Sequence, residues 1–576
     1  MILLRKIALY LISILIASCF VKANKATLIE LSKEKYNLSF ERDFSMYAPD
    51  RSWIVEGRQV KFYLDTINKY DGAKSVYLAA KQYETTYLSY CRLNQKINLP
   101  QNITGGTVSV KLRYPKKGNA SFNLLCKDTQ ENIVQNDSII PKVSNEWTEY
   151  KIKFNKQTAF FNIQINLFDS TELWIDDVQI ECKTHKNNRP QTFTDPQELL
   201  PGFKTHQTIG ALQDIQFPKD KDIIAIGESA HTSHELAIAK NEIIKSLVKK
   251  NECKLILLEA SSYMMSLVND YIHSKIDSDG LDELNITNGQ GLVYFCDEFV
   301  ELIEWLRNYN STASQDVNII GYDVDSRYYQ KIKEYIRKNK RTIPCSKFLK
   351  EYISCSETIP RAFKILHQNK DIFIEKNSEE NYFQLHSWLI EHQRSFDVYW
   401  RCHYENIVRD SITANYALNM IHKYHRKGTK VILHGHLTHL NKINITYNID
   451  RNFGAIMNER LGGNYYVISL NTGTGKLLNC KYTHHSISHI LGTPEKSSLE
   501  RRCLLSCNNK IISQSTKLYA GEKGFMTTRF AGVTVRKNQF YPMNIEKRFD
   551  HFIFIPTSTH LRIFWEKSLG EAIRTH

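Results

Sequence analysis

Residues 222–231 are Asp-Ile-Ile-Ala-Ile-Gly-Glu-Ser-Ala-His, and this stretch decides the fold expected for the chain. A short apolar run that ends in polar and ionisable residues is typical of a buried strand in a mostly parallel sheet. We therefore predict a strand over Asp222–Gly227. Glu228 and His231 follow directly after it, at the edge where such a strand ends.

The same pattern occurs four more times, and longer helical patterns lie between these runs. Short strands that alternate with helices indicate βαβ units and a mostly parallel sheet flanked by helices. A longer helical insert, about residues 326–425, lies between the third and fourth runs. We predict an α/β domain over residues 203–565. Its further strands are expected at Lys254–Glu259, Val317–Asp323, Lys430–His434 and Tyr465–Leu470.

Ionisable side chains follow four of these five predicted strands. Ligands of open parallel sheets bind beyond the carboxyl ends of the strands, so these side chains should meet in one crevice. A single strand that ends in an acid would mean little, whereas four such strands indicate a site. The residues concerned are Glu228 and His231, Glu259, Asp323, and His436 with His439.

Lys240 occupies an unusual place on the helix predicted after His231. It lies four residues from Leu236 and four from Ile244, and therefore on the apolar stripe of that helix. A charged residue on a core-facing stripe is rarely buried without a partner. Lys240 therefore either points into the crevice and pairs with a carboxylate or a developing anion, or extends past the edge of the stripe to water.

The N-terminal part of the chain has a different pattern, with short alternating apolar and polar runs over residues 28–182. Val108–Tyr114 is the clearest run, and such alternation predicts antiparallel strands in an all-β sandwich. Glu146–Lys151 and Leu173–Ile180 resemble strands of jelly-roll carbohydrate-binding modules. The resemblance concerns the fold, and a glycan partner is a further possibility. Residues 183–202, with three prolines, are predicted to be a linker.

The first residues predict export. Arg5 and Lys6 precede an apolar segment that is too short to span a bilayer, as in a secretory signal over residues 1–18. Leu15–Cys19 resembles a bacterial lipobox, in which Cys19 is lipidated and anchors the protein to a membrane. We expect a membrane lipoprotein at the outer membrane or the periplasmic face. Ordinary cleavage after Ala23 is the alternative.

Composition limits the classes of partner. With 42% hydrophobic and 24% charged residues, the 576-residue chain is not mostly disordered. The net charge is +15, but its densest basic cluster, within residues 331–341, has the spacing of a solvated helix face. We therefore expect no nucleic-acid partner. The cysteines have irregular spacing without a CxxC pair, which argues against a zinc site or a disulfide framework.

Taken in order, the motifs at the strand ends resemble those of the erythromycin esterase family. The resemblance covers about residues 200–565 and leaves out the sandwich. Each motif is weak alone, but their order and spacing agree throughout. The motifs are Ile226–His231, Glu235, Leu258–Ala260, Gly321–Asp323, Arg409–Asp410, His436–His439, and the stretch from Phe453 to Tyr466.

This resemblance implies hydrolysis of an ester or macrolactone without a covalent intermediate and without a metal or other cofactor. It implies that His231 is the general base that activates water, because imidazole accepts a proton near neutral pH. Glu228 would orient the His231 ring and stabilise its cation. The remaining implied roles are catalytic for Glu259 and His436, and substrate-binding for His439, Lys240, Asp323 and Arg409.

Two positions depart from the family pattern. Lys240 stands where the family usually has Arg, which keeps the charge and loses bidentate geometry. Leu437 stands where the family usually has Asn, which removes a hydrogen-bond donor. The resemblance therefore supports the reaction class more strongly than it supports a macrolide substrate.

Other functions stay open at this point. The same His and Glu residues could hold a divalent metal in a metal-dependent hydrolase. Alternatively, the chain could be a non-enzymatic surface lipoprotein that binds glycans through residues 28–182. A serine hydrolase is excluded, because Gly227-Glu-Ser-Ala has His231 where the GxSxG motif needs its second glycine.

Overall fold

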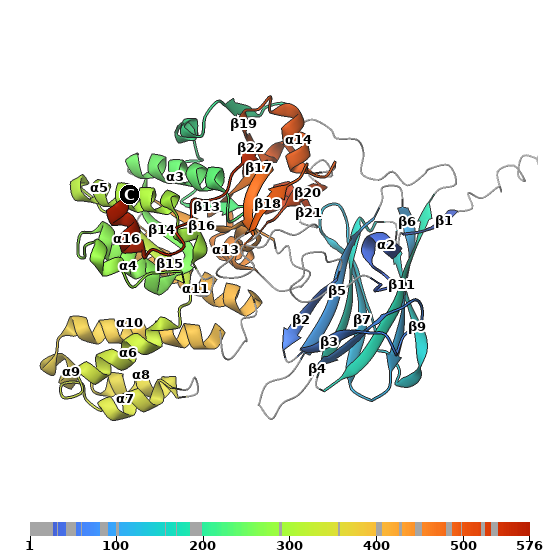
Figure 1. Ribbon diagram of the computed structural model, residues 1–576, viewed down its shortest axis with the longest axis horizontal. Coiled ribbons are helices and arrows are strands. Elements are labelled where there is room, and N and C mark those ends of the chain that lie inside the picture. The colour runs from blue at the N-terminus through green and yellow to red at the C-terminus, as the bar shows by residue number, and fades with distance from the viewer. Residues whose placement is uncertain are drawn as a thin grey trace, which may run out of the picture. The chain divides into compact units, whose positions relative to one another are not determined.

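The computed structural model divides into two compact units, 1–195 and 196–576 (Figure 1). Its described residues are 27–31, 33–41, 53–58, 60–80, 90–99, 103–155, 157–168, 170–184, 199–250, 252–286, 291–354, 358–398, 406–425, 429–443, 452–479, 487–496, 498–519, 525–531 and 540–576. Cys19 and the predicted signal segment lie outside them. Within the described residues, no helix is both long and apolar enough to cross a membrane.

The first unit is a β-sandwich of two antiparallel sheets, as predicted (Figure 1). One sheet has the order β3-β4-β11-β6-β9, with β1 paired to β11, and the other has the order β2-β5-β10-β7-β8. A short helix, α2 (Lys33–Tyr36), follows β1. The strands are β1 (Thr27–Glu30), β2 (Ile54–Arg58), β3 (Val60–Asp65), β4 (Ser75–Ala80), β5 (Tyr90–Asn98), β6 (Ile103–Tyr114), β7 (Asn119–Lys127), β8 (Ile133–Ile139), β9 (Ser144–Asn155), β10 (Phe160–Phe168) and β11 (Glu172–Thr184).

Period-two alternation explains how this sandwich closes. Val108, Val110 and Leu112 of β6 point into the core between the sheets and are buried. The intervening side chains face outward. The core of the sandwich thus forms from alternate residues of both sheets, and its strands need no other element to cover their inner faces.

The second unit is built on a nine-stranded, mostly parallel sheet, as predicted. The strand order is β12-β19-β22-β17-β13-β16-β14-β15, with β18 paired to β17. Parallel pairing joins β22, β17, β13, β16, β14 and β15 in sequence across the sheet. The strands are β12 (Lys204–His206), β13 (Ile223–Glu228), β14 (Cys253–Ser261), β15 (Asn318–Asp323), β16 (Lys430–His436), β17 (Tyr465–Asn479), β18 (Ile487–Leu491), β19 (Ile511–Ser515) and β22 (His551–Ser558).

All five predicted strands are present, and they form the contiguous centre of this sheet as β17-β13-β16-β14-β15. Every residue of β13 and β16 is buried. The sequence analysis did not predict β12, β18, β19 or β22. β22, β19 and β12 extend the sheet beyond β17, and antiparallel pairs join β22 to β19 and β19 to β12. β18 makes an antiparallel pair with β17 itself.

Helices cover both faces of the sheet, and the alternation within β13 shows the two layers. Ile224 and Ile226 pack in one core with α3 (His234–Lys249), α4 (Ser262–Ile272) and α5 (Asp297–Thr312). Ile223 and Ala225 pack in a second core with α11 (Asn406–Tyr424), α13 (Phe453–Leu461) and α14 (Leu499–Ser506). The central strands are therefore buried on both faces, which explains their uniformly apolar sequences.

The predicted helical insert is also present (Figure 1). It has its own hydrophobic core. Leu349, Leu366 and Leu385 belong to this core, which packs α7, α8 and α10 against α6. The helices of the insert before α11 are α6 (Arg327–Lys338), α7 (Ser346–Tyr352), α8 (Ile359–Gln368), α9 (Lys370–Lys376) and α10 (Glu379–Phe396). The fold class is thus an α/β unit with a helical insert, preceded by a β-sandwich.

Candidate active site

The carboxyl ends of β13 and β16 bring the first two candidate residues side by side. The strands are parallel, and Glu228 is the direct neighbour of His436 in their register. β13 ends at Glu228, and α3 begins at His234 after Ser233, whose hydroxyl accepts the Leu236 N–H at 3.2 Å. His231 therefore lies on a short loop fixed at both ends.

Glu228 and His231 form the first dyad. Oε1 of Glu228 lies 2.7 Å from Nδ1 of His231. The Glu228 carboxylate is buried, whereas the His231 side chain keeps 17% of its surface exposed. Because Nδ1 donates to the carboxylate, Nε2 of His231 is the nitrogen that can accept a proton.

A buried histidine, His434, faces the other carboxylate oxygen of Glu228. Nε2 of His434 lies 3.6 Å from Oε2, and Nδ1 of His434 donates to the Ile226 carbonyl at 2.9 Å. Burial, together with the charge of Lys240, lowers the pKa of His434 to about 4. His434 is therefore neutral at neutral pH. His434 was not among the site residues predicted from the sequence, although it ends the fourth predicted strand.

Lys240 is buried with only 5% exposure, so it does not extend to water. Burial lowers the pKa of Lys240, and the charge of Glu228 is the largest influence that opposes this shift. Of the two alternatives for Lys240, the structure thus shows the inward orientation, with Glu228 as the main carboxylate in its electrostatic environment.

Glu259 joins the two halves of the site. Its Oε1 accepts the Nη2–H of Arg409 at 2.8 Å, and its Oε2 accepts the backbone N–H of His436 at 2.7 Å. Burial alone would raise the pKa of Glu259, but the charges of His439, Arg409 and His231 hold it well below its usual range. Glu259 is therefore a fixed anion beside both His231 and His439.

Gly435 makes this arrangement of Glu259 possible. A Cβ atom at Gly435 would lie 2.5 Å from the Tyr322 hydroxyl and 2.7 Å from Oε2 of Glu259. Any side chain at this position would push Glu259 away from the His436 N–H.

Arg409 and Asp323, both predicted to bind substrate, face each other. Nε of Arg409 donates to Oδ1 of Asp323 at 3.1 Å, and Nη2 donates to Oδ2 at 2.7 Å. The Arg409 side chain is 8% exposed and also contacts Glu259. The structure thus places both residues at the site and joins them by a bidentate ion pair. Their role toward substrate stays a prediction.

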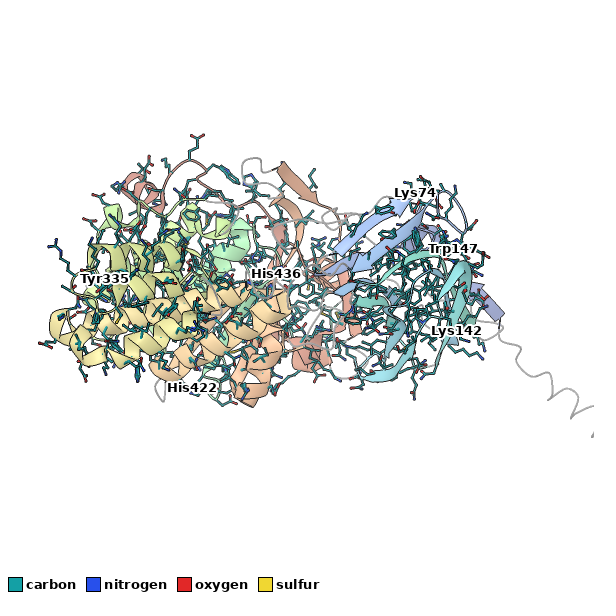
Figure 2. All side chains as sticks on the ribbon, turned by 90° about the horizontal axis from the view of Figure 1, so that it is seen from below. Lys74, Lys142, Trp147, Tyr335, His422 and His436 are labelled. Atoms are coloured by element: carbon teal, nitrogen blue, oxygen red, sulfur yellow. The ribbon has the colours of Figure 1, made fainter. Side chains whose placement is uncertain are left out.

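His436 lies between the other two site histidines. Its ring centroid is 4.5 Å from that of His231 and 6.4 Å from that of His439. Burial, reinforced by the charges of His231 and His439, lowers the pKa of His436 well below its usual value. His436 is therefore neutral at neutral pH (Figure 2 labels it).

His439 and Asp410 form a second dyad, which the sequence analysis did not predict. His439 lies on α12 (Leu437–Leu440), and its Nδ1 is 2.9 Å from both carboxylate oxygens of Asp410 on α11. Oδ2 of Asp410 also accepts the backbone N–H of Phe453 at 3.1 Å. Asp410 belongs to a motif of the family resemblance, but its position within a helix gave no reason to place it at the strand ends.

The contacts thus link Glu228 to His231, and Glu259 to Arg409 and the His436 backbone, while Arg409 in turn holds Asp323. In the described part of the chain, no group of three or more His, Cys, Asp or Glu residues is arranged to hold a metal ion. The oxygens of Glu259 that a metal would need instead accept N–H hydrogen bonds.

Comparison with solved structures finds similar folds that cover different parts of the chain. A Bacillus cereus protein matches with 18% identity and a TM-score of 0.49, covering 63% of this chain and 96% of its own. An erythromycin esterase mutant in its open conformation matches with 14% identity and a TM-score of 0.47, covering 62% of this chain and 98% of its own.

For the sandwich, the carbohydrate-binding module TmCBM61, solved in complex with β-1,4-galactotriose, matches with 20% identity and a TM-score of 0.19. It covers 25% of this chain and 94% of its own. No curated protein matches the sequence.

The erythromycin esterase family model matches residues 248–558, which are more than half of the chain. The matched range includes Glu259, Asp323, Arg409, His436 and His439, and it begins after the loop that carries His231. This chain belongs to the erythromycin esterase family.

Proposed function

We propose that the second unit hydrolyses an ester or lactone through a water molecule that His231 activates, without a covalent intermediate. The single observation that carries this proposal is the first dyad, in which buried Glu228 holds Nδ1 of His231 at 2.7 Å. A histidine that is fixed by a carboxylate and partly open to solvent has the arrangement of a general base.

In this mechanism, Nε2 of His231 removes a proton as the water oxygen attacks the carbonyl carbon. The tetrahedral intermediate then collapses, the bond to the alcohol oxygen breaks, and a carboxylic acid and an alcohol leave. Glu228 stabilises the imidazolium that forms on His231. His436 and His439 would polarise the carbonyl or protonate the leaving oxygen.

The test is a panel of esters and lactones with wild-type protein and the His231→Ala variant. General-base catalysis contributes about 10²- to 10⁴-fold, so we expect the variant to lose that much in kcat on every substrate. His422→Ala is the matched control, because His422 is exposed on α11 (Figure 2). A folded His231→Ala variant with unchanged kcat would refute the proposal.

We also propose that the protein is exported and anchored to a bacterial membrane through lipidated Cys19. The support is the sequence of residues 1–19 alone. In this proposal, a Cys19→Ala variant no longer incorporates a labelled fatty acid and moves from the membrane fraction to the soluble fraction. Incorporation that is equal in both proteins would contradict it.

A glycan partner for the sandwich is a second proposal, which a row of aromatic side chains supports. Tyr63 of β3 stacks on Tyr77 of β4 at 4.7 Å, and Tyr77 contacts Trp174 of β11 edge-on at 5.0 Å. Tyr63 is 41% exposed, and Trp174 is partly exposed. Aromatic rings along one sheet face can contact sugar rings, here beside the cationic groups of Lys61 and Arg113, which lie over these rings.

The test for glycan binding is a glycan array with the full chain and a Tyr63→Ala/Trp174→Ala variant. Binding that disappears in the variant supports the proposal, and the esterase activity should not change. Trp147 on β9, labelled in Figure 2, offers a control, because it contacts Tyr70 rather than the row.

A further inference from the structure

The second dyad is built like the first, and its task is still open between polarising the carbonyl and protonating the leaving oxygen. Asp410 is 4% exposed, and its two oxygens hold Nδ1 of His439. The Phe453 N–H, at the start of α13, fixes the Asp410 carboxylate from its other side. The His439 side chain is 20% exposed. Nε2 of His439 is the nitrogen that Asp410 does not hold, and it lies 3.5 Å from Nη1 of Arg409 and 3.7 Å from Oε1 of Glu259.

The charges around His439 favour its protonated form. Asp410 and Arg409 face it from α11, Glu259 from β14 and His436 from β16. Burial would lower the pKa of His439, but the charges of Asp410 and Glu259 outweigh burial and the opposing charge of Arg409, so its pKa is raised. Asp323 is held by Arg409 and partly balances that charge.

His231 and His439 are each held at Nδ1 by a carboxylate, whereas His436 is not. His439 favours a proton, whereas buried His436 disfavours one. When environments push neighbouring titratable groups apart in this way, they indicate which group is the acid. His436 is unsuited to donate a proton, because it is neutral and only 5% exposed.

Ester hydrolysis needs an acid only when the leaving oxygen is a poor leaving group. A phenolate is the conjugate base of a group with a pKa of about 10 and leaves without help, whereas an aliphatic alkoxide is a much stronger base. An acid in the same site as the general base, with His436 between them, therefore indicates substrates whose alcohol is not activated.

We propose that His439 is the general acid of this site, that Asp410 is its positioning residue, and that the substrates are esters or lactones of aliphatic alcohols. As the tetrahedral intermediate collapses, the electron pair of the breaking C–O bond goes to the alcohol oxygen. That oxygen takes the proton from Nε2 of His439. Solvent later removes the proton from His231 and returns one to His439, so the step balances. This inference rests on the hydrolysis proposed above.

The experiment compares two esters of the same acid, a p-nitrophenyl ester and an ethyl ester. For His439→Gln we expect kcat/KM to fall by about 10²- to 10⁴-fold on the ethyl ester, as for the loss of a general acid. On the p-nitrophenyl ester we expect a fall of less than tenfold. That activity also shows that the variant is folded. Equal losses on the two esters would overturn the inference.

Asp410→Asn tests the positioning role and decides the matter if His439→Gln does not fold. With the wild type, kcat/KM on the ethyl ester should fall at alkaline pH as His439 loses its proton. Without the Asp410 charge, the pKa of His439 is less raised, so this alkaline limb should move to lower pH. An unmoved limb would refute the positioning role.

His425→Gln is the matched control, because His425 also lies near an aspartate, 3.6 Å from Asp222. Asp222 precedes β13, so this pair lies at the opposite ends of the strands from the site. Its ratio of ethyl to p-nitrophenyl activity should equal that of the wild type. A different result would refute the hydrolysis proposal itself. In that case, either the wild-type protein cleaves neither ester, or the His231→Ala variant cleaves both at the wild-type rate.

Discussion

Replacing Glu228 with Gln tests the electrostatics of the first dyad without a change of shape. In the wild type, the carboxylate accepts from Nδ1 of His231 at 2.7 Å and lies 3.6 Å from Nε2 of His434. It also provides the largest influence that favours the charge of buried Lys240. The Gln amide has nearly the same volume as the Glu carboxyl group, but His231, His434 and Lys240 then no longer face a negative charge.

The expected loss of activity follows from the tautomer of His231. The Gln amide can donate to Nδ1, which would leave the hydrogen on Nε2, where the mechanism needs a lone pair. Loss of the tautomer and of the stabilised cation should lower kcat by about 10³- to 10⁴-fold, as for the orienting acid of a catalytic triad.

The same change should destabilise the fold, because Lys240 then lacks its main counter-charge. Glu228 acts on Lys240 through its charge rather than through a contact ion pair, so we expect a cost below the about 3–5 kcal/mol of breaking a buried ion pair, and Lys240 can also lose its proton. The unfolded chain binds more protons than the folded one when a lysine pKa is lowered by folding, so stability rises with pH. The loss in the Glu228→Gln variant should therefore be largest at low pH and smaller at alkaline pH.

The assay combines kcat on the ester panel with thermal melts from pH 6 to pH 10, read by circular dichroism. Glu242→Gln is the control on the same helix as Lys240, because Glu242 contacts Lys245 and Gln213 rather than the site. A Glu228→Gln variant with near wild-type kcat would refute the role of the dyad. A loss of stability that grows with pH would refute the coupling to Lys240.

Three further predictions follow from the geometry. Gly435→Ala should lower both the melting temperature and kcat, because its Cβ would meet the Tyr322 hydroxyl and Oε2 of Glu259, and soluble, fully active protein would contradict this. Activity should survive exhaustive dialysis against chelators, and metal-dependent recovery of lost activity would favour the metal-dependent alternative. Stability of the second unit should fall between pH 6.5 and pH 4, because burial lowers the pKa of His434 and of His551 to about 4 and the unfolded chain therefore binds more protons in this range. Each histidine contributes about 3 kcal/mol at most to that fall, and His551→Gln should reduce the slope in denaturant-unfolding measurements across pH.

Local patterns were sufficient to predict the central strands and the residues at their ends. An apolar run such as Ile223–Ile226 is specified by its own sequence, and the carboxyl ends of parallel strands meet at one edge whatever their order. The sequence analysis therefore placed Glu228, His231 and His436 together without knowing that β16 lies beside β13.

The missed features depend on tertiary contacts. β22 and β19 extend the sheet through pairing partners far along the chain, which no local pattern specifies. Asp410 reaches His439 from the middle of α11, and a helical position shows nothing of which strand end it faces. The inward direction of Lys240 was likewise open, because periodicity gives the stripe but not the partner.

Glu259 explains why two separate dyads can act as one site. The Glu228–His231 pair is fixed by β13 and its loop, and the Asp410–His439 pair by α11 and α12, so no side chain of one pair hydrogen-bonds the other in the described residues. Glu259 is the anion that both histidines share, since the charges of His439 and His231 each hold its pKa down. The negative charge of Glu259 therefore stabilises the protonated form of either imidazole. Because its oxygens are fixed by Arg409 and the His436 backbone, Glu259 provides this charge to base and acid alike without taking the proton from either.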